Sequence, residues 1–223
     1  CVEPLLLQLK DIVGKHTGIS FTLKCDGCSE VFDSSKKIPV MRDIEQFKRD
    51  VWEGLNKPLK HISSKYFYDR RGDELFQKIM KMESYYLPEC ELEIILNQGA
   101  SMVDEIGHNS LDIIELGAGD GSKTQYLLEQ FIKSGNSIKY FPLDISPEIL
   151  NFNQNKMKSR FPNLEIHALD GDYFKTLKDL PHRQTRMYLF MGSNIGNFQE
   201  KQAIDFLKLI HSTMKKGDVL MLG

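Results

Sequence analysis

The chain has 223 residues and a net charge of −2, with 41% of its residues hydrophobic and 27% charged. This length suits one sizeable domain, alone or with a smaller appendage, and the even spread of Lys and Arg argues against a nucleic-acid-binding surface. No apolar run approaches the roughly 20 residues that span a membrane and no signal peptide is apparent, so we expect a cytosolic protein without nucleic-acid or membrane partners.

Residues 1–38 form an N-terminal extension to which we assign no function. Its most distinctive feature is the C-x-x-C pair formed by Cys25 and Cys28. Such a pair can bind zinc or carry out redox chemistry, but Cys1 and Cys90 form no second pair, and no group of histidines completes a set of four ligands. We expect two reduced cysteines around a glycine turn and no metal site, with zinc or redox chemistry as the alternative.

Residues 39–105 have the pattern of a helical segment. Apolar residues recur at the spacing of one helix face in residues 41–60 and again around Phe76, and a further helix is predicted from about Glu89 to Asn97. Two loops that carry aromatic residues flank the short middle helix, and their tyrosines are Tyr66, Tyr68, Tyr85 and Tyr86.

Residues 106–223 alternate between strand patterns and helix patterns. This order predicts an α/β fold with a parallel sheet covered by helices on both faces. The predicted strands are 112–116, 138–143, 164–169, 187–191 and 218–222. The predicted helices between them are 123–134, 147–160 and 199–214, and Ser146 followed by Pro147 is a favourable helix start.

The first of these strands leads into three glycines with alternate spacing, Gly117, Gly119 and Gly121. A strand, a glycine turn and a helix start in this order form a site where backbone N–H groups can approach a ligand closely. The dinucleotide fingerprint G-x-G-x-x-G would need its third glycine at position 122, which is Ser122. The spacing therefore argues against a dinucleotide site and favours another nucleotide-type cofactor.

The ends of the later strands carry residues that suit such a cofactor, because ligands of open α/β sheets bind beyond the carboxyl ends of the strands. Asp144 ends the second strand, where a carboxylate can accept hydrogen bonds from ribose hydroxyls. Asp172 follows the third strand and can accept from an adenine amino group, with Tyr173 beside it to cover the ring. The fourth strand ends in the small and amide residues of 190–198, which suit the place where a transferred group meets its acceptor.

An acidic strand end followed by G-x-G-x-G looks like the first motif of S-adenosylmethionine-dependent methyltransferases, and the wider pattern resembles one family of these. Over roughly residues 42–223 the chain is similar to the histidine-specific S-adenosylmethionine-dependent methyltransferases. These include the enzyme that methylates the α-amine of L-histidine on the way to ergothioneine. The resemblance rests on SSKYFYDRRGDELFQKIM, the pair Tyr85-Tyr86, ELGAGDGSKT, PLDISPE, DGDYF and MGSNIGNF.

The resemblance implies a Rossmann-like class I methyltransferase sheet with an N-terminal helical segment, residues 39–105, which we expect to cap the cofactor and the substrate. It also assigns roles to individual residues. It implies that Tyr85 and Asn197 bind the amino-acid substrate and that Tyr68 lies near the substrate amine, which makes Tyr68 our candidate catalytic residue. The residues implied to bind S-adenosylmethionine are Gly117, Lys123, Asp144, Asp172 and Tyr173.

Two departures from the family pattern bear on the substrate. Leu87-Pro88-Glu89-Cys90 follows the tyrosine pair where many members have Pro-Thr-Arg, and the sequence stops at Gly223 as its fifth strand ends. Family members continue for about a hundred residues, so we expect a C-terminally truncated sheet and little turnover by these 223 residues. L-Histidine is the expected acceptor. The alternatives are an amine derived from histidine or tryptophan, an NAD-dependent oxidoreductase, and a non-catalytic methyltransferase-like fold.

Overall fold

A computed structural model describes residues 44–67, 70–107 and 110–223 of the chain. The chain divides into two compact units, Cys1–Trp52 and Glu53–Gly223. Within the first unit the described residues belong to helix α2 (Ile44–Asn56), on which Phe47 and Val51 are buried. The predicted extension 1–38, with its C-x-x-C pair, lies outside the described residues.

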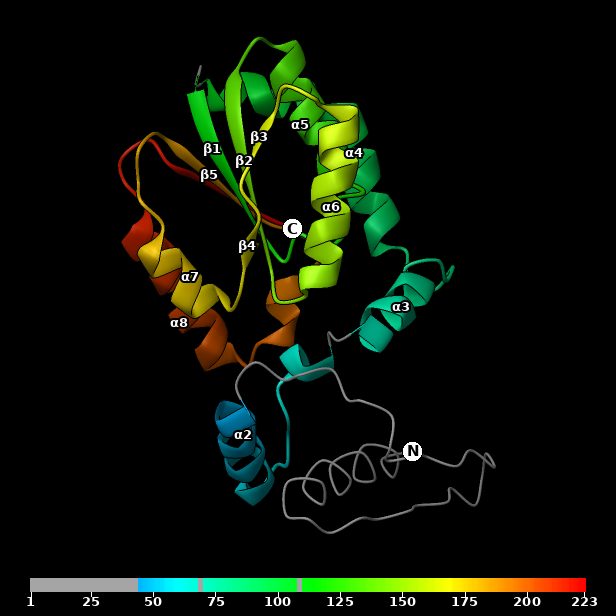
Figure 1. Cartoon of the computed structure of the whole chain (residues 1–223), viewed down its shortest axis with the longest axis vertical. Coiled ribbons are helices and arrows are strands. Elements are labelled where there is room, and N and C mark those ends of the chain that lie inside the picture. The colour runs from blue at the N-terminus through cyan, green and yellow to red at the C-terminus, as the bar shows by residue number, and fades with distance from the viewer. Residues whose placement is uncertain (1–43, 68–69, 108–109) are drawn as a thin grey trace. The chain divides into compact units, whose positions relative to one another are not determined.

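The second unit is built on a parallel sheet, as the sequence predicts (Figure 1). Its strand order is β3-β2-β1-β5-β6, and β4 pairs with β2 beyond the end of β3. Central strand β1 is buried over six consecutive residues because helices cover both of its faces. The strands are β1 (Ser110–Leu116), β2 (Ser137–Asp144), β3 (Glu165–Ile166), β4 (Leu169–Asp170), β5 (Arg186–Phe190) and β6 (Val219–Leu222).

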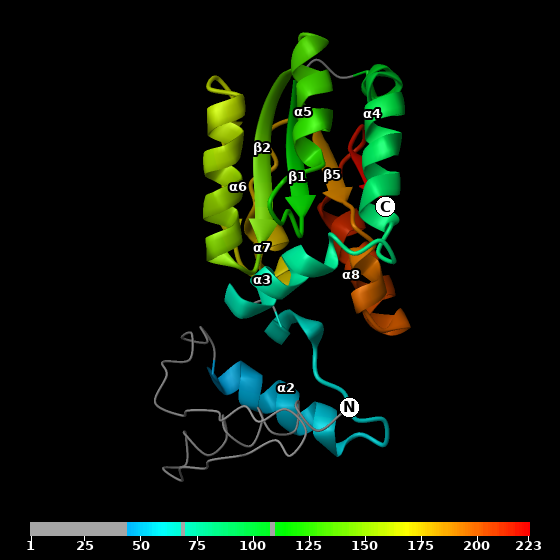
Figure 2. The same ribbon diagram turned by 90° about the vertical axis from the view of Figure 1, so that its right-hand side faces the viewer.

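Five helices form two layers on this sheet (Figure 2). One layer consists of α4 (Leu87–Ile106), α5 (Thr124–Lys133) and α6 (Pro147–Arg160). The opposite layer consists of α7 (Tyr173–Asp179) and α8 (Glu200–Thr213). The described part of this unit contains three further elements, η1 (Ser64–Phe67), α3 (Arg70–Ile79) and η2 (Asn194–Asn197), and α3 lies across the end toward which β1 and β2 point.

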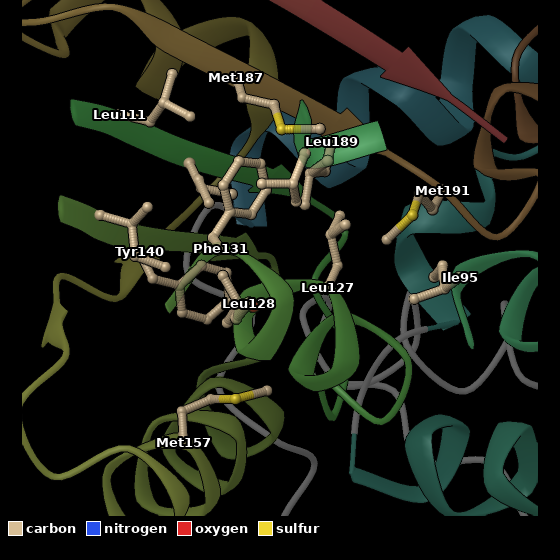
Figure 3. Packing of buried hydrophobic residues seen from close by; sticks show 13 residues of the cluster. Ile95, Leu111, Leu127, Leu128, Phe131, Tyr140, Met157, Met187, Leu189 and Met191 are labelled. Atoms are coloured by element: carbon tan, nitrogen blue, oxygen red, sulfur yellow. The ribbon is translucent and has the colours of Figure 1, made fainter. Parts of the chain in front are cut away.

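The two helical layers bury separate apolar cores because side chains alternate between the faces of each strand. On the α4–α5–α6 side, Leu127 and Phe131 of α5 meet Leu111, Met187 and Leu189 of the strands (Figure 3). On the other side, an aromatic core packs between the sheet, α7 and α8. Phe206 at its centre is fully buried and lies against Tyr173, Phe174, Phe190 and Phe198.

Three details of the sequence prediction need correction. The helix predicted from about Glu89 to Asn97 is α4, which runs for 20 residues until Gly107 ends it in the left-handed conformation. The strand predicted over 164–169 is two short strands, both paired with β2. Helix α7 was not predicted. Within the described ranges, no helix combines the length and the apolar character that crossing a membrane requires.

Candidate cofactor and substrate site

A cavity of about 510 Å³ opens at the carboxyl ends of the strands. It lies where the strand order reverses, since β2 flanks one side of β1 and β5 flanks the other, and this is where open α/β sheets bind ligands. Its volume falls within the range of small-molecule sites. Seven of the eight predicted site residues line it: Tyr85, Gly117, Lys123, Asp144, Asp172, Tyr173 and Asn197. The eighth, Tyr68, lies outside the described residues.

The glycine loop after β1 needs glycine at two positions for different steric reasons. Gly117 has φ +72°, and a Cβ there would lie 2.7 Å from the Tyr173 hydroxyl and 2.9 Å from the Asn194 amide nitrogen. Gly121 has φ +64°, and a Cβ there would lie 2.3 Å from Cε of Met157. The first glycine lets the side chains of Tyr173 and Asn194 approach the loop closely, whereas the second lets the loop pack on α6.

A buried polar cluster supports the loop from beneath. The Glu115 carboxylate accepts hydrogen bonds from the hydroxyls of Thr124 and Tyr140. Asn153 of α6 donates to the carbonyl of Gly119 at 3.0 Å. Burial raises the pKa of Glu115 to about 7, although Lys123 and the two hydroxyls act in the opposite direction. The acidic strand end noted in the sequence is therefore a structural support of the loop.

Asp144 is held by backbone N–H groups on both of its carboxylate oxygens. Oδ2 accepts from Gly119 at 3.0 Å and Oδ1 accepts from Ser146 at 3.1 Å. Burial raises the pKa of this carboxyl, and the nearby Asp73 carboxylate raises it further, while the backbone donors lower it. Because each carboxylate oxygen has more than one acceptor position, Asp144 can still accept from a ligand hydroxyl.

Asp172 and Tyr173 form the start of α7. Asp172 caps this helix, since its Oδ1 accepts from the N–H of Phe174 at 2.9 Å. The Tyr173 ring packs on Phe206 with centroids 5.5 Å apart, and its hydroxyl end reaches the edge of Gly117. The side chain that we expected to cover an adenine ring thus joins the aromatic core to the glycine loop.

Lys123, the residue before α5, forms an ion pair with Glu91 of α4. The other oxygen of Glu91 accepts from the N–H of Gly192 at 2.7 Å. Both charged side chains are largely buried, at 16% and 17% exposure. One carboxylate therefore links the helical segment to the glycine loop and to the loop after β5.

The loop after β5 turns sharply into the cavity. Ser193 has φ +53°, a conformation that costs a non-glycine residue about 1 kcal/mol or more. The turn places the Asn194 side chain over Gly117, where its amide donates to the carbonyl of Met191 at 2.8 Å. Asn197 ends the same turn and lines the cavity, as does Tyr85, whose ring is edge-on to Phe76.

Sequence reasoning missed two residues that line this cavity, Asp73 and Asn194, and a third, Glu91, that contacts the lining residues Lys123 and Gly192. Asp73 accepts from the Ser146 hydroxyl at 2.6 Å and so ties α3 to the loop that carries Asp144. Asn194 lies within a motif that the sequence did single out, so its place could have been anticipated. No pattern marks Glu91, because its partners Lys123 and Gly192 lie 32 and 101 residues away in sequence.

The fold and the cavity define a class: a parallel α/β protein with a nucleotide-type cofactor site at the switch point of its sheet. Residues 47–223 match the model of the family described as histidine-specific methyltransferase, SAM-dependent. The chain belongs to this family, as its motifs predict.

Individual relatives agree with this family. The chain is 32% identical to the histidine N-alpha-methyltransferase of Mycobacterium tuberculosis over 79% of this chain and 54% of that protein. It is 32% identical to ergothioneine biosynthesis protein 1 of Neurospora crassa over 70% of this chain and 18% of that protein. It is 30% identical to a 4-dimethylallyltryptophan N-methyltransferase of Penicillium roqueforti over 75% of this chain and 51% of that protein. The chain spans about half the length of the mycobacterial relative.

Proposed function

We propose that this chain binds S-adenosylmethionine and takes part in methylation of the α-amine of an amino acid, with L-histidine as the acceptor. The observation that supports this proposal best is the convergence of seven predicted residues on one cavity at the switch point. Family membership supports the cofactor and the type of reaction. The acceptor rests on the histidine N-alpha-methyltransferase relative.

The residues around the cavity suit this cofactor along its whole length. Gly117 lines the cavity without a side chain, and Lys123 supplies a cation for a carboxylate. Asp144 offers acceptors for ribose hydroxyls, and Asp172 offers an acceptor for an adenine amino group. When bound, the cofactor supplies a methyl group on a sulfonium, and the protein contributes chiefly positioning.

The acceptor side of the proposal rests on Tyr85, Asn197 and Tyr68. The Asn197 amide suits a substrate carboxylate, because it offers two donors at the cavity wall. An ammonium has no lone pair, so the site must favour the neutral amine. We assign to Tyr68 the orientation of that nitrogen, on the basis of its motif.

A second candidate is the same reaction on a tryptophan-derived amine. The observation that favours it is the 30% identity to a 4-dimethylallyltryptophan N-methyltransferase. This candidate keeps every cofactor assignment and differs only in the group that fills the acceptor side of the cavity. The two candidates are separated by the ligand that binds beside the cofactor.

Replacing Asn197 by alanine tests the acceptor assignment. In calorimetric titrations with S-adenosylhomocysteine already bound, we expect L-histidine to bind the unaltered chain and to bind Asn197→Ala about tenfold more weakly, since an amide donor to a carboxylate is lost. The affinity for S-adenosylhomocysteine itself should stay the same. Equal loss of both affinities would show that Asn197 is not an acceptor residue, and binding of dimethylallyltryptophan in place of histidine would favour the second candidate.

A further inference from the structure

The pair Lys123–Glu91 has a feature that the proposed function does not use: the cation expected to meet the cofactor carboxylate already has an anion beside it. Lys123 lies directly after the glycine loop, as the residue before α5. Glu91 reaches it from α4 and is fixed at its other oxygen by the N–H of Gly192. The carboxylate is therefore held in place by two separate segments.

This ion pair makes the local net charge close to zero at the point where the cofactor carboxylate is expected to bind. Both side chains are more than four-fifths buried, so their fields are screened less than those of surface groups. A ligand carboxylate that approaches Lys123 also approaches the carboxylate of Glu91, and the repulsion offsets part of the attraction. If the ligand also carries an ammonium next to its carboxylate, the attraction between this ammonium and Glu91 compensates for the repulsion.

We infer that Glu91 is a specificity-determining residue, which makes this end of the cavity select an α-amino-acid zwitterion over a simple carboxylate. The inference rests on the proposed function, and it assigns the zwitterion to the methionine end of the cofactor because Lys123 adjoins the glycine loop. Lys123 alone would accept any carboxylate. Lys123 with Glu91 accepts a carboxylate that carries its own ammonium.

Two ligands that differ only in the ammonium test this inference. S-Adenosylhomocysteine carries the zwitterion, and its analogue without the α-amino group carries the carboxylate alone. By calorimetry, the unaltered chain should prefer S-adenosylhomocysteine. In Glu91→Gln this preference should fall about tenfold, chiefly because the analogue binds more tightly. Glutamine keeps the shape of the side chain and a carbonyl that can accept from Gly192.

Three further variants complete the design. Glu93→Gln removes an exposed charge from the same helix and should keep the preference of the unaltered chain. Glu91→Asp keeps the charge and should keep most of the preference. Lys123→Met leaves Glu91 alone, and the preference for the ligand with the ammonium should then increase. If Glu91→Gln does not fold, Lys123→Met still tests the effect of Glu91 on the preference between the two ligands.

The outcomes separate the inference from the proposed function. No binding of S-adenosylhomocysteine by the unaltered chain would overturn both. Binding by the unaltered chain, with the same preference in Glu91→Gln, would overturn the inference alone, because a merely structural Glu91 would weaken both ligands equally. If Glu91→Gln changed only the preference between L-histidine and its analogue without the amino group, the pair Lys123–Glu91 would act on the acceptor. That result would overturn the assignment of the pair to the cofactor.

Discussion

Replacing Asp144 by alanine is expected to weaken the binding of S-adenosylhomocysteine by about a hundredfold. The carboxylate lies at the end of β2 and both of its oxygens accept from backbone N–H groups of flanking loops. Its loss removes the proposed acceptors for two ribose hydroxyls and releases the N–H of Gly119 in the glycine loop. Calorimetric titration at one temperature and ionic strength measures the effect.

Two variants show whether that loss is specific. Asp144→Asn keeps the shape and one oxygen acceptor, so its affinity should lie between those of the alanine variant and the unaltered chain. Asp179→Ala makes the same change at an exposed position at the end of α7 and should leave the affinity unaltered. An Asp144→Ala protein that melts normally and binds S-adenosylhomocysteine as tightly as the unaltered chain would disprove the ribose assignment.

Replacing Glu115 by glutamine should change how stability depends on pH. The folded protein keeps the Glu115 proton up to a pKa of about 7, whereas the unfolded chain releases it near the ordinary value of 4.5. The folded state thus binds more protons between these values, and the free energy of unfolding falls as the pH rises through that window. Relative to Glu115→Gln, the unaltered chain should lose about 3 kcal/mol of unfolding free energy from about pH 4 to about pH 8.

Denaturant unfolding at a series of pH values measures this difference. Glu105→Gln changes an exposed glutamate at the end of α4 and should show the same pH dependence as the unaltered chain. Parallel curves for the unaltered chain and Glu115→Gln would mean that Glu115 has the same pKa in the folded protein as in the unfolded chain. The raised pKa of Glu115 would then be wrong.

The residues that could be predicted from sequence are those whose position follows from a strand end. Gly117 directly follows β1 and Asp144 is the last residue of β2, and the carboxyl ends of parallel strands meet at one edge of the sheet. The start of α6 was also predictable, because the Ser146 hydroxyl accepts from the N–H of Ile149 and Pro147 occupies the first turn. In each case the signal lies within a few residues of the feature that it predicts.

What could not be predicted depends on contacts between distant segments. The helix that we expected to end near Asn97 continues through Gly99, because this glycine is buried and a Cβ there would lie 3.3 Å from Gln130 of α5. A glycine that looks like a helix stop is instead a point where two helices approach closely. Glu91 escaped prediction for the same reason, since its role appears only when α4 packs beside the loops.

Asp172 is compatible with two interpretations of an aspartate that follows a strand: a helix cap and a residue that binds the cofactor. An aspartate after a strand is often a helix cap, and Asp172 does cap α7 through Oδ1. A cap uses one acceptor position of a carboxylate, so the proposed contact with an adenine amino group remains compatible with it. The cap fixes the side chain at the cavity wall before any ligand binds.

The central claim is that the cavity at the end of β1 binds S-adenosylmethionine and not a dinucleotide. Calorimetric titration of the unaltered chain with S-adenosylhomocysteine and, separately, with NAD tests it most directly. We predict saturable binding of one S-adenosylhomocysteine per chain and no detectable heat with NAD, because the glycine spacing lacks the third position of the dinucleotide fingerprint. Binding of NAD without binding of S-adenosylhomocysteine would contradict the account.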